Sequence, residues 1–435
     1  MNNLKIIEFD RNKNSSIIKM FFNRAIVESK ALEAANKIVN NIKINGDTAL
    51  KKSIAKYDNV NVNLKKIKVS DQEIQLAINS VDKSFVKAMN YAKKNIIKFS
   101  KASLKKDWKE KTKNGGYVGE RFIPIKRVGC YIPGGSAPLV STALMTVILA
   151  KIGGVNEIIA CSPPSIDGSL NPNIIYALHK SGAKEIYKMG GAHAIAAMAY
   201  GTKTIKKVNK IVGPGGPYVT AAKKIVYGDV AIDMVAGPSE IGILTDSSAN
   251  PKYVAADLLS QAEHGTSLEK ALLITTSMKQ AKLVKEQVLI QSKELKRKKM
   301  ITEVINNGML IVVVKNLNDG VHLINDFAPE HMELIVKNPK KIIPMIRTAG
   351  ALFVGSWTPE CVGDFVAGPS HVLPTGGTCN YFSGLTVDDF RRRMSIVEYK
   401  EDDLKDSLES IEIFGNIETL DAHSKSATIR FGKEV

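Results

Sequence analysis

The chain has 435 residues, which is too long for a single hydrophobic core and sufficient for two domains with small appendages. Its composition, 44% hydrophobic and 24% charged, is that of a globular protein and excludes an intrinsically disordered one. The formal net charge of +18 does not indicate nucleic-acid binding, because the excess comes from lysines scattered along the chain without interleaved aromatic residues.

The first ten residues mix charged and apolar side chains, without the apolar core and cleavage site of a secretory signal. The uncharged stretch 128–150 is interrupted by Pro133 and Pro138, which predicts a buried helix rather than a bilayer span. Four cysteines without close pairs indicate neither a disulfide framework nor a thiolate metal site. We therefore expect a cytoplasmic protein with no membrane segment, in which any metal has other ligands.

Residues 28–56 and 70–113 have the apolar spacing of helices. From about residue 118 the pattern changes to short β-branched runs, each followed by Gly or Pro and then by an apolar helix. The strands expected in this stretch are 118–128, 157–161, 185–189 and 210–212. This alternation predicts a parallel α/β sheet. Its glycine turns lack the G-x-G-x-x-G fingerprint, so they fit either a dinucleotide site or a sheet that needs glycine merely to fold.

A second set of α/β elements begins at Ile241, with strands expected at 271–275, 310–314, 332–336 and 351–354. From about residue 385 the chain becomes charged and helical, and a last strand is expected at 428–431. This tail is too short for a core of its own, so we expect it to dock on another surface.

An adjacent carboxylate and imidazole follow a proline in the second set. Pro329 fixes its own φ and disfavours the helical region for Ala328, so Glu330 and His331 should begin a new element. Histidine can accept a proton from an alcohol near neutral pH, and an adjacent Glu can activate water. The dipeptide alone also fits an ordinary surface Glu and His, so its interpretation depends on other polar residues of the chain.

Several nitrogen and oxygen donors could bind one ion. Gln261 and His264 stand three residues apart, which places them on one face of a helix. The others are Asp364 and His371 in a Gly/Pro-rich loop, and Glu418 and His423 in the tail. Such donors suit zinc with a position left for substrate, whereas each histidine by itself fits an ordinary hydrogen-bonded residue.

Six motifs together resemble the histidinol dehydrogenase family, in the family's order and over nearly the whole chain. They are Val128–Gly135, Gly190–Ala192, Val230–Glu240, Asp257–His264, Ala328–His331 and Gly368–Pro374. Six separate motifs are far more specific than any one of them. The resemblance implies a zinc-containing, NAD-dependent homodimer. Its expected reaction is the last step of histidine biosynthesis, in which L-histidinol is oxidised through L-histidinaldehyde to L-histidine with reduction of two NAD.

The resemblance also implies residue roles. One zinc ion per subunit is expected on Gln261, His264, Asp364 and His423. Glu330 and His331 are expected to be the catalytic acid/base pair. The residues expected to contact L-histidinol are Ser239, Gln261, His264, His331, Asp364, His371, Glu418 and His423. Those expected at the dinucleotide are Tyr131, His193 and Gly216.

The expected fold is α/β, with two Rossmann-like parallel-sheet lobes and small N- and C-terminal appendages used in dimerisation. Residues 1–27 form the N-terminal appendage in this interpretation. Residues 28–128 with 240–384 form a first lobe carrying the zinc and acid/base residues, and 129–239 form a second, dinucleotide-binding lobe. Residues 385–435 form a tail that completes the partner subunit's site.

Two positions depart from the family pattern. His193 stands where the family usually has Gln, and Gly216 where it usually has Asn, so looser binding of NAD is expected. The alternative function is that of a same-fold NAD-dependent dehydrogenase of another small polar alcohol, such as a sulfonated diol. Glu418 disfavours that alternative, because a carboxylate suits a cationic amine rather than a sulfonate. Neither nucleic acid nor a membrane is expected as a partner.

Overall fold

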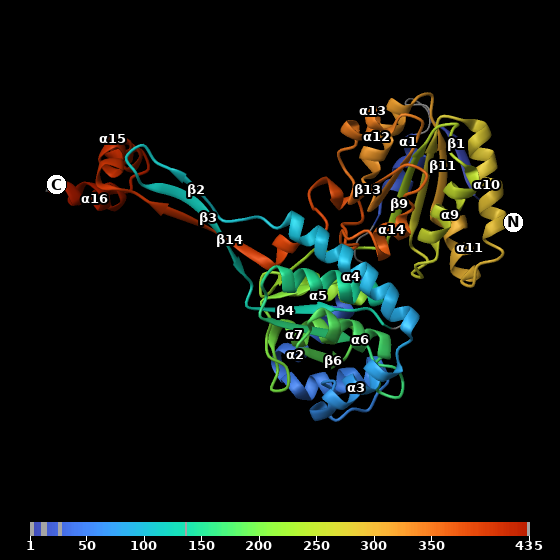
Figure 1. The fold of residues 1–435 in the computed structure, drawn as a ribbon, viewed down its shortest axis with the longest axis horizontal. Helices are drawn as coiled ribbons and strands as arrows, with labels where there is room; N and C mark the ends of the chain where they lie inside the picture. The colour runs from blue at the N-terminus through green and yellow to red at the C-terminus, as the bar shows by residue number, and fades with distance from the viewer. Residues whose placement is uncertain (1–3, 10–14, 25–27, 135–136, 433–435) are drawn as a thin grey trace. The chain divides into compact units, whose positions relative to one another are not determined.

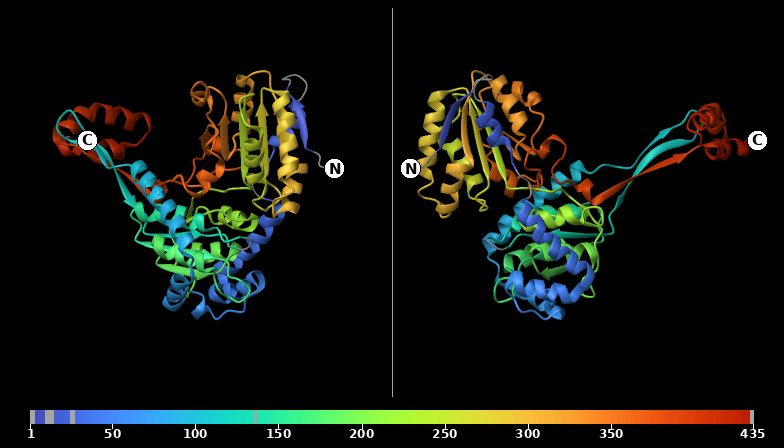
Figure 2. Two further views of the ribbon diagram at one scale, coloured as in Figure 1. Left: turned by 45° about the vertical axis from the view of Figure 1, so that its right-hand side comes forward. Right: turned by 180° about the vertical axis from the view of Figure 1, so that it is seen from behind.

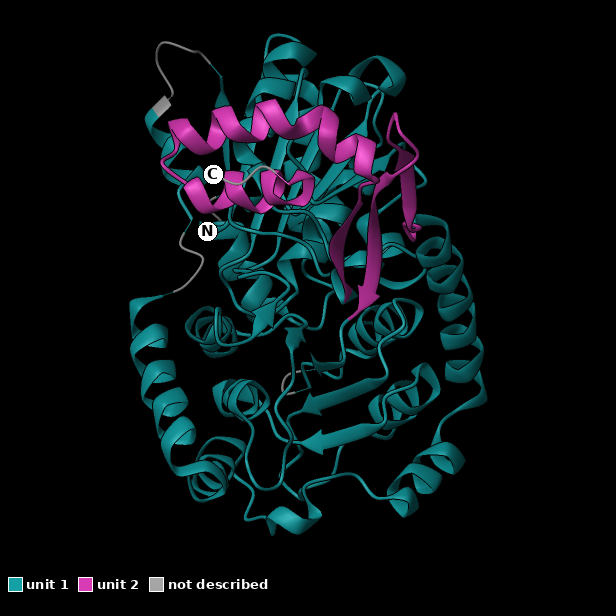
Figure 3. Cartoon of the chain, turned by 90° about the vertical axis from the view of Figure 1, so that its left-hand side faces the viewer, with its two compact units in different colours: residues 1–103, 125–390 teal, residues 104–124, 391–435 magenta. Residues whose placement is uncertain are grey.

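The chain, in a computed structural model, is described over residues 4–9, 15–24, 28–134 and 137–432. It divides into two compact units, Met1–Ser103 with Ile125–Phe390 and Leu104–Pro124 with Arg391–Val435 (Figure 3). Within the described residues, no helix combines the length and the apolar character needed to cross a membrane.

The first unit contains a six-stranded parallel sheet in the order β1-β11-β10-β9-β12-β13 (Figure 1). The strands are β1 (Lys5–Glu8), β9 (Glu240–Thr245), β10 (Lys270–Thr275), β11 (Met309–Val313), β12 (His331–Ile335) and β13 (Ala351–Val354). Their apolar character is nearly continuous, because helices cover both faces of the sheet.

One face of this sheet packs on α9 (Pro251–Ala262), α10 (Met278–Gln291) and α11 (Lys298–Asn307). The other face packs on α1 (Ser15–Phe22), α12 (Leu317–Phe327) and α13 (Pro339–Ile342), and Figure 2 shows the two helical layers. The short helix α14 (Glu360–Phe365) follows β13.

The same unit contains a five-stranded parallel sheet in the order β6-β5-β4-β7-β8. Its strands are β4 (Arg127–Tyr131), β5 (Glu157–Ser162), β6 (Glu185–Lys188), β7 (Lys210–Val212) and β8 (Ala231–Ile232). One core joins it to α3 (Asp71–Ser80), α4 (Lys83–Ser103), α5 (Val140–Ile152) and α6 (Pro172–Ser181). A second core joins it to α2 (Ser29–Ser53), α7 (Gly191–Tyr200) and α8 (Pro217–Val226).

The second unit is a three-stranded antiparallel sheet in the order β14-β3-β2 with two helices. Its elements are β2 (Trp108–Lys111), β3 (Tyr117–Pro124), β14 (Arg391–Glu398), α15 (Glu401–Ile417) and α16 (Asp421–Thr428). The buried Asp403 carboxylate accepts hydrogen bonds from the Thr112 hydroxyl and from the N–H groups of Asn114 and Gly116. It thereby ties the first helix of the tail to the β2–β3 turn.

Short helical turns complete the described elements. They are η1 (Ile54–Asp58), η2 (Leu64–Lys66), η3 (Ile343–Met345), η4 (Thr378–Asn380), η5 (Val387–Phe390) and η6 (Ile429–Phe431).

The predicted α/β fold with two parallel sheets is confirmed, but the structure divides the chain differently. Helices α2 to α4 had been expected with the lobe of residues 240–384, within 28–128, and they pack instead on the five-stranded sheet. Helix α2 packs on α7 and α8, α3 on α6 and α4 on α5, and periodicity does not encode this pairing. At the N-terminus, the expected appendage 1–27 includes β1, which is an edge strand of the six-stranded sheet beside β11.

The elements near the second unit also differ from expectation. The strand expected at 118–128 is two strands: β3 pairs antiparallel with β14, and β4 alone joins the parallel sheet. Residues 108–111, expected to be helical, form β2. The strand expected at 428–431 is the end of α16 followed by η6. The expected tail 385–435 starts before the second unit does, because η5 packs on α5 in the core of the first unit through Phe390.

Candidate active site

The predicted acid/base pair lies at the amino-terminal end of the six-stranded sheet. Helix α12 ends at Phe327, the next residue Ala328 turns the chain sharply with a φ of 45°, and β12 begins at His331. The expectation that Glu330 and His331 begin a new element is therefore confirmed, and that element is a strand. Both side chains are buried, with whole-residue exposures of 5% and 2%.

The carboxyl group of Glu330 is hydrogen-bonded to the neighbouring strand. Its Oε2 accepts the main-chain N–H of Glu240 at 3.0 Å, because the register of β9 and β12 pairs Ile241 with His331. Burial raises the pKa of Glu330 to about 8, although the nearby His331 opposes the shift. A carboxyl group with this pKa can give or accept a proton near neutral pH.

The imidazole of His331 is surrounded by carboxylates. Its Nδ1 lies 3.4 Å from Glu360 Oε1 and 3.8 Å from Glu330 Oε2, and its Nε2 lies 3.5 Å from Asp364 Oδ1. Burial by itself would lower the pKa of His331, but the charges of Glu360 and Glu330 and the contact with Asp364 raise it well above its ordinary value. The ring therefore binds a proton readily.

The first-unit residues predicted to bind zinc meet beside this ring. Gln261 lies in the last turn of α9 and His264 follows that helix, and His264 Nε2 lies 4.0 Å from Asp364 Oδ2. His264, Glu360 and Asp364 can each offer a ligand atom within 4.8 Å of one another. Two atoms bonded to one tetrahedral zinc ion at about 2.1 Å each lie about 3.4 Å apart, so His264 and Asp364 would bind such an ion after a shift of about 0.6 Å.

The amide of Gln261 is consistent with that arrangement. It is fully buried and lies 3.2 Å from His264 Nδ1. With its oxygen toward this nitrogen, the amide accepts the Nδ1–H of His264 and donates to Glu360. His264 Nε2, on the opposite side of the ring, then faces Asp364 and is available to a metal ion.

Asp364 is the residue that joins the imidazoles. Burial would raise its pKa, but the hydrogen bond and charge of His331, with the charges of His371 and His264, lower the pKa to about 2. The group is therefore a carboxylate throughout the physiological range. A permanently charged oxygen among three histidines is suited to a divalent cation.

Glu360 was not predicted from the sequence, although it is only 1% exposed and contacts His331. Its carboxylate accepts the Ser260 hydroxyl at 3.2 Å. A signal was present, because Glu360 follows Pro359 at a helix start and stands four residues before Asp364, on the same helical face.

Four of the first-unit residues predicted to contact substrate, His264, His331, Asp364 and His371, line two cavities. His371 Nε2 lies 3.1 Å from the Thr142 hydroxyl, and burial lowers the pKa of this histidine. One cavity of about 330 Å³ is lined by His331, Asp364 and His371, and another of about 420 Å³ is lined by His264, Asp364 and His371. Both are large enough for a small polar ligand. Ser239 directly precedes β9.

Two of the predicted site residues belong to the second unit. Glu418 directly follows α15, and His423 lies in α16; both are exposed. They are not among the side chains that meet in the first unit.

The residues predicted at the dinucleotide lie at the carboxyl ends of three strands of the five-stranded sheet, where such sheets bind ligands. Tyr131 ends β4, and its hydroxyl accepts the N–H of Gly191 at 3.0 Å. His193 in α7 is only 1% exposed, and its Nε2 lies 2.8 Å from Asp58 Oδ2. Gly216 precedes α8, and a Cβ there would meet no atom within 4 Å. Asp58, the partner of His193, was not foreseen.

The comparisons with known proteins agree over nearly the whole chain. The family model for histidinol dehydrogenase matches residues 23–431. The histidinol dehydrogenase of Listeria innocua serovar 6a is 43% identical over 397 residues, 91% of this chain and 92% of the relative. That of Bacillus thuringiensis subsp. konkukian is 42% identical over 432 residues, 99% of this chain and 100% of the relative.

A solved structure agrees as well. Histidinol dehydrogenase from Elizabethkingia anophelis has a TM-score of 0.93 at 35% identity, covering 99% of this chain and 98% of that one. An acetylating aldehyde dehydrogenase from Geobacillus thermoglucosidasius, 14% identical with a TM-score of 0.51, covers 89% of this chain and 99% of that one and shares the fold alone. The motifs, the fold and these matches lead to one conclusion: this chain belongs to the histidinol dehydrogenase family.

Proposed function

We propose that this enzyme oxidises L-histidinol through L-histidinaldehyde to L-histidine and reduces two NAD, as the last step of histidine biosynthesis. Family membership supports the substrate and the oxidation. The observation that carries the proposal is the meeting of Glu330, His331, His264 and Asp364 at one end of the six-stranded sheet. An acid/base pair there adjoins a group of donors that suits a metal ion.

The metal proposed is one zinc ion per subunit, bound by Gln261, His264 and Asp364, with His423 supplied by the other subunit of a homodimer. The 4.0 Å separation of His264 Nε2 and Asp364 Oδ2 supports the first part. The second part is supported by the position of His423 in a small unit of its own. When bound, zinc would hold the imidazole and amino nitrogens of histidinol and polarise its hydroxyl group.

His331 is the base in both oxidation steps of the proposal. In the first step the hydroxyl proton of histidinol passes to His331, and a hydride passes from the same carbon to NAD, which gives the aldehyde. In the second step Glu330 takes a proton from water as the water oxygen adds to the aldehyde carbon, and His331 returns its proton to the aldehyde oxygen, which gives the hydrate. The hydrate then loses a hydroxyl proton to His331 and a hydride to a second NAD. The carboxylates around His331 favour its protonated state, so they stabilise the ring as it accepts each proton.

The cysteines support a hydrated aldehyde rather than a thiohemiacetal. Cys130 and Cys161 are fully buried in the five-stranded sheet, and burial raises the pKa of both. Burial and neighbouring carboxylates also raise the pKa of Cys361, and burial raises that of Cys379 to about 12. The attacking species in such catalysis is a thiolate, and none of these thiols ionises at neutral pH.

The proposed NAD site lies at the carboxyl ends of β4, β6 and β7, near Tyr131, His193 and Gly216. The amino-terminal ends of α7 and α8 follow these strands and suit a pyrophosphate. His193 would hold the turn before α7 through Asp58, because Asp58 contacts the His193 ring and also accepts the N–H of Gly190 at 3.3 Å. Cytoplasmic localisation is part of the same proposal.

The deciding experiment is an end-point assay of NADH formed from a limiting amount of L-histidinol by the purified enzyme. We expect two NADH and one L-histidine per histidinol, with no accumulated aldehyde. One NADH per histidinol would contradict the four-electron reaction. Activity with a sulfonated diol and none with histidinol would replace this function by the alternative dehydrogenase.

A further inference from the structure

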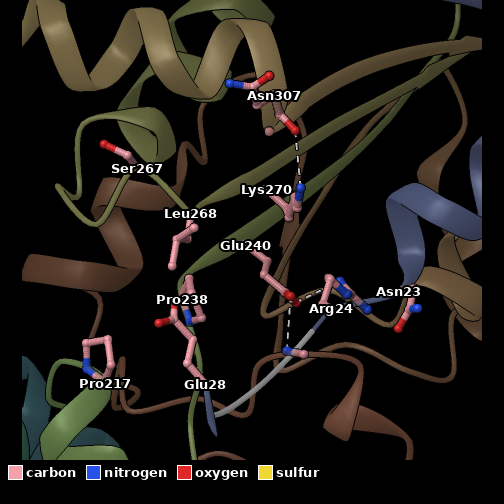
Figure 4. Close-up of a pocket in the computed structure, with 12 residues that line it drawn as sticks. Asn23, Arg24, Glu28, Pro217, Pro238, Glu240, Ser267, Leu268, Lys270 and Asn307 are labelled. Atoms are coloured by element: carbon pink, nitrogen blue, oxygen red, sulfur yellow. Dashed lines mark hydrogen bonds and ion pairs between the residues drawn. The ribbon is translucent and has the colours of Figure 1, made fainter. Parts of the chain in front are cut away.

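A buried ion pair that has no role in the proposed reaction lies next to the acid/base pair. Arg24 Nη1 lies 2.9 Å from Glu240 Oε2, and the two side chains are only 7% and 3% exposed. Figure 4 shows the guanidinium and the carboxylate pointing toward each other, with the Glu240 carboxylate also accepting a main-chain N–H. That N–H belongs to Gly376, at 3.0 Å.

Glu240 holds both members of the acid/base pair through its main chain. Its N–H donates to Glu330 Oε2 at 3.0 Å, and its carbonyl oxygen lies 3.2 Å from His331 Nδ1. A shift of this residue would therefore move the contacts of both catalytic side chains together. The side chain of Glu240 is in turn anchored by Arg24 and Gly376.

Arg24 also contacts the end of α12, just before the turn that leads to Glu330 and His331. Its Nη2 donates to the main-chain oxygen of Phe327, the last residue of α12, and its guanidinium lies 4.1 Å from the centre of the Phe327 ring. Phe327 precedes Glu330 by three residues. The guanidinium of Arg24 thus connects Phe327, where the turn begins, to Glu240 on β9, the strand that pairs with β12 after the turn.

The charge of the guanidinium matters because the pair is buried. Burial raises the pKa of Glu240 to about 7, and Arg24 is the strongest of the influences that oppose this rise. Without Arg24, the carboxylate would be left buried beside two other acidic groups, Glu330 and Cys379. The guanidinium therefore supports the geometry through its charge as well as its hydrogen bonds.

We infer that Arg24 is a positioning residue, which clamps Phe327 to Glu240 and through Glu240 sets the geometry of Glu330 and His331. This inference deepens the proposed function and rests on it. Neither the composition nor the spacing of the sequence points to Arg24, which lies more than 200 residues from each of its partners.

A cavity beside Arg24 makes the inference testable by chemical rescue. It has a volume of about 270 Å³ and is lined by Arg24, Glu240, Lys270, Ser267, Leu268 and Asn307, among others. Replacing Arg24 by Ala would extend this space to the Glu240 carboxylate. A guanidinium ion carries the same charge and the same planar set of N–H donors, so it should occupy the vacated place.

The experiment compares the steady-state kinetics of the wild-type holoenzyme and Arg24→Ala with L-histidinol. We expect kcat to fall by about ten- to a hundredfold, because misplaced catalytic groups slow the chemistry. The KM for histidinol should change by less than about twofold, because Arg24 does not contact the proposed substrate site. Guanidinium, kept well below denaturing concentrations, should restore kcat with saturation, and methylammonium should restore much less.

Two further variants separate this role from a general loss of stability. Lys270→Met removes the other cation shown beside the cavity, which donates to Asn307 O at 3.2 Å and not to Glu240, so its kcat should stay near wild type. Glu240→Gln should reproduce the loss caused by Arg24→Ala. The double variant Arg24→Ala/Glu240→Gln should lose no more than either single variant, because both act through one contact.

The inference is overturned if folded Arg24→Ala retains wild-type kcat, if guanidinium leaves its kcat unchanged, or if the two losses multiply. A measurement that does not depend on enzyme turnover tests the positioning role of Arg24 separately from the proposed function. The ¹⁵N signals of the His331 imidazole, assigned with His331→Gln, should change position in Arg24→Ala and return with guanidinium. If the wild-type enzyme failed to oxidise histidinol, the proposed function would fail, while unchanged ¹⁵N signals would refute the positioning role.

Discussion

Glu360 places a carboxylate oxygen 3.4 Å from Nδ1 of His331, and both side chains are almost completely buried. Burial would lower the pKa of His331, and Glu360 is the strongest of the groups that raise it. A neutral Gln at this position would remove that charge and lower the pKa of the ring. Since His331 accepts a proton only when it is neutral, Glu360→Gln should move the acidic limb of the kcat profile to lower pH.

The measurement is kcat for histidinol oxidation between about pH 5 and 9. Asp326→Asn is the matched control, because Asp326 lies 3.5 Å from the exposed His322 and should leave the profile unchanged. An acidic limb at the wild-type pH in Glu360→Gln would show that Glu360 does not govern His331.

His264→Asn should remove the proposed zinc ion. The substitution deletes the Nε2 that faces Asp364, and we expect zinc affinity to fall by at least about tenfold, with loss of activity and a folded protein. His322→Asn changes an exposed histidine away from the donors and should retain zinc. Zinc per subunit is measured by elemental analysis after dialysis, and retention of a full equivalent by His264→Asn would contradict this ligand assignment.

The proposal that His423 completes the other subunit's site predicts complementation. His264→Asn and His423→Asn should each be inactive alone. After the two are mixed and allowed to exchange subunits, each mixed dimer should have one site with both histidines intact. Activity should then return to about a quarter of the wild-type value, because about half of the dimers are mixed. If the mixture stayed inactive although mixed dimers formed, each site would take both histidines from one subunit.

Gly216→Asn should tighten NAD binding. The backbone at Gly216 has a φ of −66°, which any residue adopts, and a Cβ there meets no atom within 4 Å. An added amide can restore one hydrogen bond, and we expect the KM for NAD to fall by about two- to twelvefold. The KM for histidinol serves as the internal control and should stay constant. Unchanged affinity for NAD would place the dinucleotide elsewhere.

Glu333→Gln should change how stability depends on pH. Burial and the hydrogen-bonded Asp257 raise the pKa of Glu333 well above its ordinary value, and burial raises that of Asp257 to about 6. The folded state therefore retains a proton that the unfolded chain has lost. The free energy of unfolding should fall as pH rises above about 4.3, the ordinary pKa of Glu, until the folded group titrates.

A Gln at position 333 does not titrate and still accepts the N–H of Glu360, which Glu333 accepts at 2.8 Å. Glu333→Gln should therefore be more stable than the wild type by at least about 1 kcal/mol at pH 8, with a smaller difference near pH 5. Urea unfolding at both pH values measures this. Glu303→Gln, at an exposed carboxylate, is the control and should show no such change. An equal effect at both pH values would mean that Glu333 is ionised in the folded protein.

Local features of the sequence predicted much of the fold and the place where the candidate acid/base pair begins. Short apolar runs before glycine turns located strands such as β5, and strand–helix alternation predicted two parallel sheets. Pro329 indicated that Glu330 and His331 begin a new element. These predictions succeeded because backbone restriction by proline and side-chain periodicity are properties of neighbouring residues.

The tertiary structure decided which distant segments meet. Apolar faces of α2 to α4 would pack on either sheet, so their sequence did not show that they join the five-stranded one. In the same way, only the register that pairs Ile241 with His331 brings Glu240 to the acid/base pair. Glu360 and Arg24 reach that pair across long separations in the chain. Hydrophobic burial is non-directional, so a sequence specifies which residues are buried more readily than which buried charges become partners.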